Sequence, residues 1–155
     1  RRRIQGELMA AHGLQERRST LAKMKTINAG RAFQGSVEDE TIIPRDSSGR
    51  VLPYAVVDFG TPVKTARDRN LANREKGQPH ALPATVSLIA GDFDAAQTLL
   101  AAYVDLLLDW APSDSSDSWE LKGGWGTRRN ATDNTPSRYI EILYWETVVN
   151  QNIVA

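Results

Sequence analysis

The sequence contains no cysteine, and this absence excludes disulfide bonds and thiolate chemistry. No uninterrupted apolar run approaches the roughly 18 residues that a membrane-spanning helix needs. No signal-peptide pattern opens the chain either. Charge of one sign is not in excess, because 19 lysines and arginines balance 19 aspartates and glutamates. A net charge of zero argues against a dedicated nucleic-acid-binding protein.

Motifs for catalysis and metal binding are also missing. His12 and His80 lack metal-ligand spacing to another histidine or carboxylate, and without cysteine a structural zinc site is not expected. The glycine-rich stretch 122–126 has neither the residue order of a phosphate loop nor a following helix, and no Gly-x-Ser-x-Gly elbow is present. Asp92 and Asp94 are spaced as paired carboxylates, but helix capping explains both. We therefore predict no enzymatic activity, no cofactor and no metal site.

The amino-acid composition is that of an ordinary globular domain. Hydrophobic residues make up 41% and charged residues 25%, and 155 residues are enough for one domain with its own core. The chain begins with Arg1 instead of Met, so we expect further residues to precede it. We predict a single domain over residues 1–155.

The zero net charge hides an uneven distribution. Residues 1–31 contain eight basic and two acidic side chains, whereas the remaining 124 residues contain eleven basic and seventeen acidic ones. The N-terminal segment therefore carries a charge of +6 and the rest of the chain −6. Three interpretations stay open: the segment binds an acidic surface of a neighbouring subunit, it faces a polyanion such as DNA, or it is a solvated helix face.

The clearest structural signal is a helix over residues 92–110. Asp94, followed by Gln97, fits an N-cap with its reciprocal partner, and Asp92 is a second candidate cap. Pro112 ends the run. The wide apolar stripe of this helix predicts that it lies on a β-sheet. The stripe consists of Ala96, Leu99, Leu100, Tyr103, Leu107 and Trp110.

A second helix is predicted within residues 4–27, starting nearer Gly13 because glycine weakens a helix. Asn28-Ala29-Gly30 is its C-terminal stop. Residues 38–49 are acidic and form a loop with a turn at Ser48-Gly49.

Strand-forming residues occur in several short segments, and one long charged segment separates two of them. Residues 61–83 have little apolar content and predict a long charged loop or a protruding β-hairpin. The predicted strands are 31–35, 51–59, 84–90, 119–121 and 138–149, with a glycine-rich loop after 121. The sequence thus predicts an α+β fold: a small, mostly antiparallel sheet with an N-terminal helix and one long helix packed on it.

The final strand, 138–149, is apolar on both faces. It is therefore either central between two layers, or one of its faces is an oligomer interface. Asp58, an acid within the strand 51–59, is expected to point outward or to pair with a basic side chain at an edge. The two faces of the final strand carry Ile140, Ile142, Tyr144 and Val148 on one side and Tyr139, Leu143, Trp145 and Val149 on the other.

Four tryptophans also indicate a protein that makes contacts, because aromatic residues are enriched in interface cores. Trp110, Trp119 and Trp145 are expected to fill the core. Trp125 is flanked by glycines and is the best candidate for an exposed contact.

The order and spacing of several segments resemble those of tail terminator proteins from long-tailed bacteriophages. The first half of the resemblance consists of Gly30-Arg31-Ala32-Phe33-Gln34-Gly35, the turn 44–51 and the strand 52–60. The second half consists of the strand 84–90, the helix 92–110, a Gly/Trp loop with Arg128-Arg129 and the closing strand 138–149.

The resemblance implies a structural virion protein, located in the neck region of the tail and assembled in the host cytoplasm, with no membrane. Such a subunit forms a homo-hexameric ring on the head-proximal end of the tail tube, ends tube polymerisation and provides the joint to the head-completion (neck) proteins. Its partners would be copies of itself, the tail tube protein and a head-completion protein, with DNA passing through the lumen. The predicted interface residues are Arg67, Arg69, Arg74, Trp125, Arg128 and Arg129.

Two other classes of function remain as alternatives. One is a different neck or head–tail connector subunit of the same kind of virion. The other is a DNA-binding module that uses the basic N-terminal segment, for which affinity would fall steeply with salt.

Overall fold

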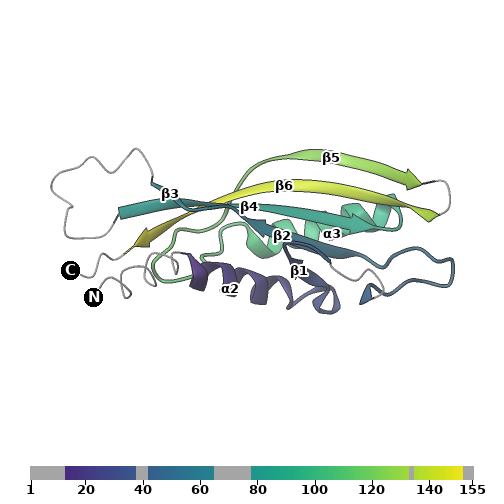
Figure 1. Cartoon of the computed structure of the whole chain (residues 1–155), viewed down its shortest axis with the longest axis horizontal. Helices are drawn as coiled ribbons and strands as arrows, with labels where there is room; N and C mark the ends of the chain where they lie inside the picture. Colours follow the sequence, from purple (N-terminus) through teal and green to yellow (C-terminus); the bar gives the residue numbers. More distant parts are fainter. Residues whose placement is uncertain (1–12, 38–41, 65–77, 133–134, 152–155) are drawn as a thin grey trace.

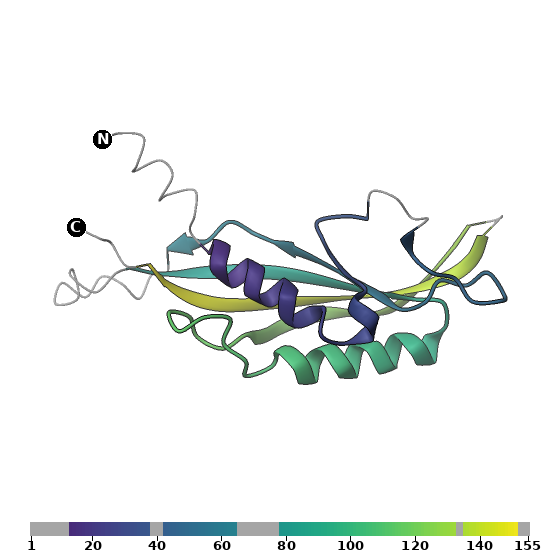
Figure 2. The same cartoon turned by 90° about the horizontal axis from the view of Figure 1, so that it is seen from below.

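The computed structural model describes residues 13–37, 42–64, 78–132 and 135–151. Within these residues the chain forms a six-stranded sheet with two α-helices packed on one face (Figures 1 and 2). The predicted α+β fold class is confirmed. The elements are α2 (Leu14–Met24), the 3-10 turn η1 (Asn28–Gly30), β1 (Ala32–Gln34), β2 (Tyr54–Phe59), β3 (Val63–Lys64), β4 (Gln78–Ala90), α3 (Phe93–Leu107), β5 (Glu120–Thr132) and β6 (Thr135–Gln151).

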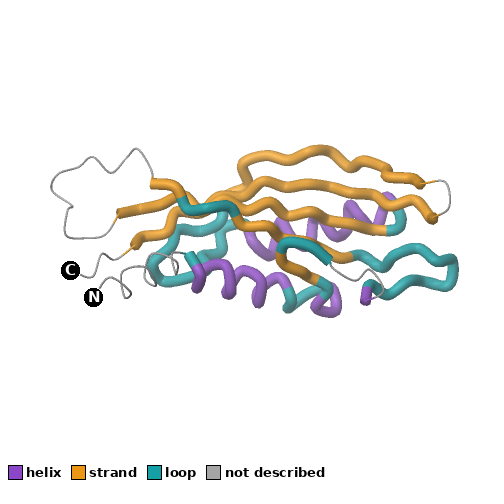
Figure 3. Tube along the Cα trace, viewed as in Figure 1, coloured by secondary structure: helices purple, strands orange, loops and turns teal. Residues whose placement is uncertain are grey.

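The sheet is mostly antiparallel, as predicted. Its strand order is β1-β2-β4-β6-β5, and β3 pairs with β4 off this path. Only the β1–β2 pair is parallel among the described pairs. The three long strands β4, β6 and β5 lie side by side along the molecule (Figure 3).

The antiparallel register sorts each strand into a helix-facing side and an opposite side. Val86 pairs with Leu143, and both belong to the core beneath the helices. Ser87 pairs with Ile142, so these two side chains point to the other face. The two apolar faces predicted for the closing strand are therefore real, and only one of them faces the helices.

Helix α3 begins at the second candidate cap and ends earlier than predicted. The Asp92 carboxylate accepts a hydrogen bond from the Ala95 amide at 2.8 Å, whereas Asp94 lies in the first turn. The helix ends at Leu107 and not at the predicted Trp110, which lies outside it. The reason is tertiary: the Trp119 amide donates to the Trp110 carbonyl at 2.9 Å, and this pairing draws the chain out of helical geometry.

The N-terminal helix starts where glycine predicts. Gly13 has a φ of 75°, a left-handed conformation outside the helix, and α2 begins at Leu14. The remainder of the predicted helix, residues 4–12, lies outside the described residues. Asn28-Ala29-Gly30 stops the segment as expected, with positive φ at all three residues.

The strands β4 and β5 differ most from their predicted limits. β4 starts at Gln78, before the predicted Ala84, and β3 pairs with it through Val63 and Ala81. The described ends of segment 61–83 are thus two paired strands, and residues 65–77 lie outside the described part. The loop predicted after residue 121 is wrong, since Gly123–Gly126 lies inside β5. Pairing with β6 overrides the low strand propensity of glycine there.

A second, smaller core lies on the face opposite the helices. Ile43 and Val51, in the connection between β1 and β2, pack there against Tyr54 and Ile89. The predicted turn closes this connection: the Asp46 carboxylate accepts hydrogen bonds from the Ser48 hydroxyl and from backbone amides. The bond from the Ser48 side chain is the largest of the interactions that lower the pKa of Asp46. This connection covers one part of the face only.

The main core joins both helices to the sheet, and Tyr103 of α3 is fully buried within it. Burial raises the pKa of Tyr103 to about 12, while Arg31 and a hydrogen bond with Asn28 oppose this effect. None of the described helices is long and apolar enough to cross a membrane.

We expect alkaline pH to destabilise the fold partly through Tyr103. Between pH 10, the ordinary value, and pH 12, the unfolded chain releases a proton that folded Tyr103 retains. The free energy of unfolding therefore falls as pH rises, by up to about 1.4 kcal/mol per pH unit from this group. Urea unfolding across this range should show a shallower decline for Tyr103→Phe than for the unaltered protein. Equal declines would show that Tyr103 ionises alike in both states.

Candidate functional site

A β-bulge in β5 places Trp125 and Arg128 on the same face of the sheet. In a regular strand, residues three positions apart point to opposite faces. Here Trp125 pairs with Ile142 and Arg128 pairs with Ile140, so β5 uses one residue more than β6 over this stretch. Such an insertion re-aims the side chains that follow it. Arg128 therefore joins Trp125 on the face away from the helices.

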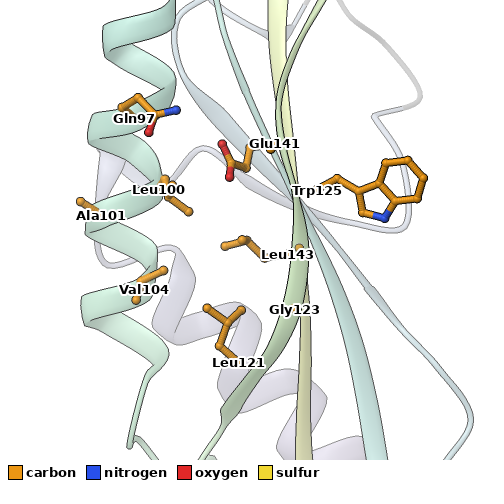
Figure 4. A pocket seen from close by; sticks show the side chains of 11 residues that line it. Gln97, Leu100, Ala101, Val104, Leu121, Gly123, Trp125, Glu141 and Leu143 are labelled. Carbon is orange, nitrogen blue, oxygen red and sulfur yellow. The ribbon is translucent and has the colours of Figure 1, made fainter.

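The two side chains are stacked on each other. The Arg128 guanidinium carbon lies 4.2 Å from the centroid of the Trp125 ring, which is within the range of a cation–π interaction. Trp125 is nevertheless 46% exposed. Figure 4 shows its side chain pointing away from α3, while Glu141, Leu143 and Leu121 project on the helix side.

Ile142 and Tyr144 of β6 extend this aromatic surface. Ile142 is the direct cross-strand partner of Trp125, and Tyr144 is the next residue on the same face. Tyr144 is 40% exposed and Ile142 is half-buried. We name Trp125, Arg128, Ile142 and Tyr144 the open-face patch. None of the described helices lies over it.

A carboxylate lies near one side of the open-face patch. Tyr144 pairs with Thr85 of β4, which in turn pairs with Asp58 of β2. Asp58 is exposed and points to this face, as expected for the outward orientation. The face therefore combines apolar, cationic and anionic side chains, the composition of a specific protein contact surface.

The structure places the predicted interface residues in three different settings. Trp125 is exposed, as expected, and stacks with Arg128. Arg129 instead pairs with Tyr139 on the helix side, and its Nε donates to the Ser137 hydroxyl at 3.0 Å. Arg67, Arg69 and Arg74 lie outside the described residues.

The other tryptophans contribute to the interior to different degrees. Trp119 and Trp145 are buried, as predicted. Trp110 is half-buried at the margin of the core, where the Lys23 ammonium lies 5.4 Å from its ring centroid. Tyr144 and Ile142 were not among the predicted interface residues, although both belong to the apolar pattern of 138–149.

The described residues contain no cluster of three or more His, Cys, Asp or Glu side chains that could hold a metal ion. Three polar side chains near α3 form a chain of hydrogen bonds. The Gln97 amide donates to the Thr127 hydroxyl, and that hydroxyl donates to the Glu141 carboxylate. This chain ties α3 to β5 and β6.

The close pairing of β5 with β6 requires glycine at position 124. A Cβ atom on Gly124 would lie 2.9 Å from the Ile142 carbonyl oxygen, a backbone atom that cannot move without shifting the strand. A Cβ on Gly126 would meet nothing within 4 Å.

We expect Gly124→Ala to lower the free energy of unfolding by about 1–3 kcal/mol, because the added methyl group overpacks the strand pair. The matched variant Gly126→Ala should change it by less than about 0.5 kcal/mol. Urea unfolding followed by circular dichroism measures both. Equal effects would mean that the steric argument for Gly124 is wrong.

Comparisons with known proteins give matches among solved structures. No protein-family model matches the chain, and no curated protein matches it either. Among solved structures, the chain is similar to a chain of the "Virion of native gene transfer agent (GTA) particle". The identity is 19%, the TM-score is 0.42, and the match covers 82% of this chain and 84% of that chain. A likeness at this TM-score carries no functional assignment.

Proposed function

We propose that this chain is a structural subunit of a phage-type virion: a tail terminator that forms a ring on the head-proximal end of the tail tube. In that role it stops tube polymerisation and offers the joint to the head-completion proteins. The observation that carries the proposal is the open-face patch, an aromatic and cationic surface left exposed on a sheet whose other face is packed under helices. The resemblance in segment order and spacing supports the same role.

The composition of the patch favours contact with protein. Tryptophan, tyrosine and arginine are the residues most enriched among those that dominate interface energies. A monomer gains nothing from exposing Trp125 and Tyr144, whereas a neighbouring subunit would remove their apolar area from water. A ring requires heterologous contacts, in which one surface meets a different one, and the mixed charges of this face suit such a contact.

The segment that contains Arg67, Arg69 and Arg74 completes the proposal. It connects β3 and β4, whose paired ends lie at the opposite end of the sheet from the connection between β5 and β6 (Figure 1). We propose that its arginines reach the adjacent subunit or the tail tube. Together with Trp125, Arg128 and Arg129, they form the proposed interface residues.

Electron microscopy of the purified protein, alone and mixed with tail tubes, tests this function. We expect rings that cap one end of each tube and tubes of uniform length. A protein that stays monomeric and does not bind the tubes would contradict the proposal. Salt-sensitive binding to DNA without rings would favour the alternative of a DNA-binding module.

A further inference from the structure

A groove on the helix side of the sheet lies between α3 and the edge strand β5 (Figure 4), and Trp125 of the open-face patch is among the residues that line it. Its volume is about 620 Å³. Leu100 and Val104 of α3 face Leu121 of β5 and Leu143 of β6 across it. Leu121 remains 39% exposed although it lies between other apolar side chains. The groove is thus an apolar site whose lining is incompletely covered.

The same groove carries negative charge. Glu141 lines it and is only 8% exposed, and its hydrogen-bond donor is the neutral hydroxyl of Thr127. A buried carboxylate is stabilised far better by a cation than by a hydroxyl. Asp94 and Asp105 are exposed on α3, within one turn of the lining residues Gln97 and Ala101, and therefore flank the groove.

The basic side chains of β5 have partners, and Arg128 stacks on Trp125 on the face away from the helices. Lys122 forms an ion pair with Glu120 at 2.6 Å. Arg129 donates to Ser137. The groove therefore fits an added segment with an apolar stripe and a positive charge.

The chain itself contains such a segment. Residues 1–12 begin with three arginines and contain one acid, Glu7. Ile4, Leu8 and Ala11 follow at helical spacing and would supply the apolar stripe. Both requirements of the groove, apolar contact and positive charge, are met by this one segment.

We propose that residues 1–12 of one subunit bind in the α3–β5 groove of the neighbouring subunit. The inference rests on the proposed ring. The segment leads directly into α2, which packs toward β1 at one edge of the sheet, whereas the groove adjoins β5 at the other edge, with α3 between them. A neighbour's segment reaches the groove without crossing α3. One segment and one groove per subunit make a heterologous contact that closes a ring.

Disulfide trapping in the full chain tests the contact, and the absence of native cysteine makes it site-specific. The test variant carries Leu8→Cys with Leu121→Cys. The control pairs Leu8→Cys with Ser48→Cys, an exposed position in the turn of the connection between β1 and β2. The three single variants, Leu8→Cys, Leu121→Cys and Ser48→Cys, report cross-linking by random collision. Because docking raises the local thiol concentration, we expect the test pair to cross-link about a hundredfold faster than the control.

The products distinguish the outcomes. A ladder of covalent dimers and higher oligomers on a non-reducing gel supports the proposal. A disulfide within one subunit, or equal rates for test and control pairs, overturns it. Changing Arg1, Arg2 and Arg3 to Glu should slow trapping, and changing Asp94 and Asp105 to Lys in that variant should restore it.

The same samples are examined with tail tubes by electron microscopy. Rings that cap tubes without any ladder would overturn the groove contact and leave the proposed function standing. A ladder in a protein that never caps tubes would support the groove contact and overturn the proposed function.

Discussion

Replacing Trp119 with alanine is expected to lower the free energy of unfolding by about 3–5 kcal/mol, the largest loss of stability from any single change discussed for this chain. Trp119 is 1% exposed and begins the return of the chain from α3 to the sheet. Its Nε1 donates to the Thr20 hydroxyl of α2 at 3.0 Å, and its ring lies 6.4 Å from that of Phe59. One side chain therefore joins α2 to the sheet within the main core, and its removal would leave a cavity there.

Two further variants separate the contributions to this loss. Trp119→Phe keeps an aromatic ring and removes the hydrogen bond, so we expect a loss of about 1–2 kcal/mol. Trp125→Ala removes a tryptophan that is 46% exposed, and its effect on unfolding should stay below about 1 kcal/mol. Urea unfolding monitored by circular dichroism measures all three. A loss below about 1 kcal/mol for Trp119→Ala would show that the core repacks around the gap.

Placing a charge in the open-face patch is expected to abolish ring assembly while leaving the fold intact. Trp125→Glu and Tyr144→Glu each bury a carboxylate against the neighbouring subunit if the patch is the interface. Loss of one dominant interface side chain costs about 2 kcal/mol or more, which is about a thirtyfold weaker association. Because a ring repeats each contact, the effect on assembly is multiplied around it.

The matched control is Leu108→Glu, which also places a charge at an exposed apolar side chain, 44% accessible, but at the C-terminal end of α3. We expect this variant to assemble and to cap tubes normally. Analytical ultracentrifugation and electron microscopy with tubes measure the outcome, and circular dichroism verifies the fold. If both patch variants form normal rings, the open-face patch is not an assembly interface.

The features that were predicted correctly are those that depend on local pattern. The 3.6-residue period identified Leu99, Tyr103 and Leu107 as the buried stripe of α3. Alternation identified two apolar faces on the closing strand, and flanking glycines identified Trp125 as exposed. Each of these signals lies within a few residues of the side chain that it describes.

The features that were missed depend on partners far along the chain. Asp94, with Gln97 three residues later, was the first candidate cap in the sequence, and the backbone geometry selects Asp92 instead. The glycine-rich part of β5 has weak strand propensity, but β6 supplies its hydrogen-bonding partner. Likewise, α3 ends before Pro112 because the chain around Trp110 pairs with Trp119.

Sequence by itself determined that this chain has no cysteine chemistry, an amphipathic helix that needs a sheet, and a closing strand with two apolar faces. Tertiary structure alone decided which of those faces the helices cover, and that Trp125 and Arg128 share the other one. The physical reason is that periodicity is a property of one segment, whereas the direction of a side chain after a bulge is set by the register with the neighbouring strand.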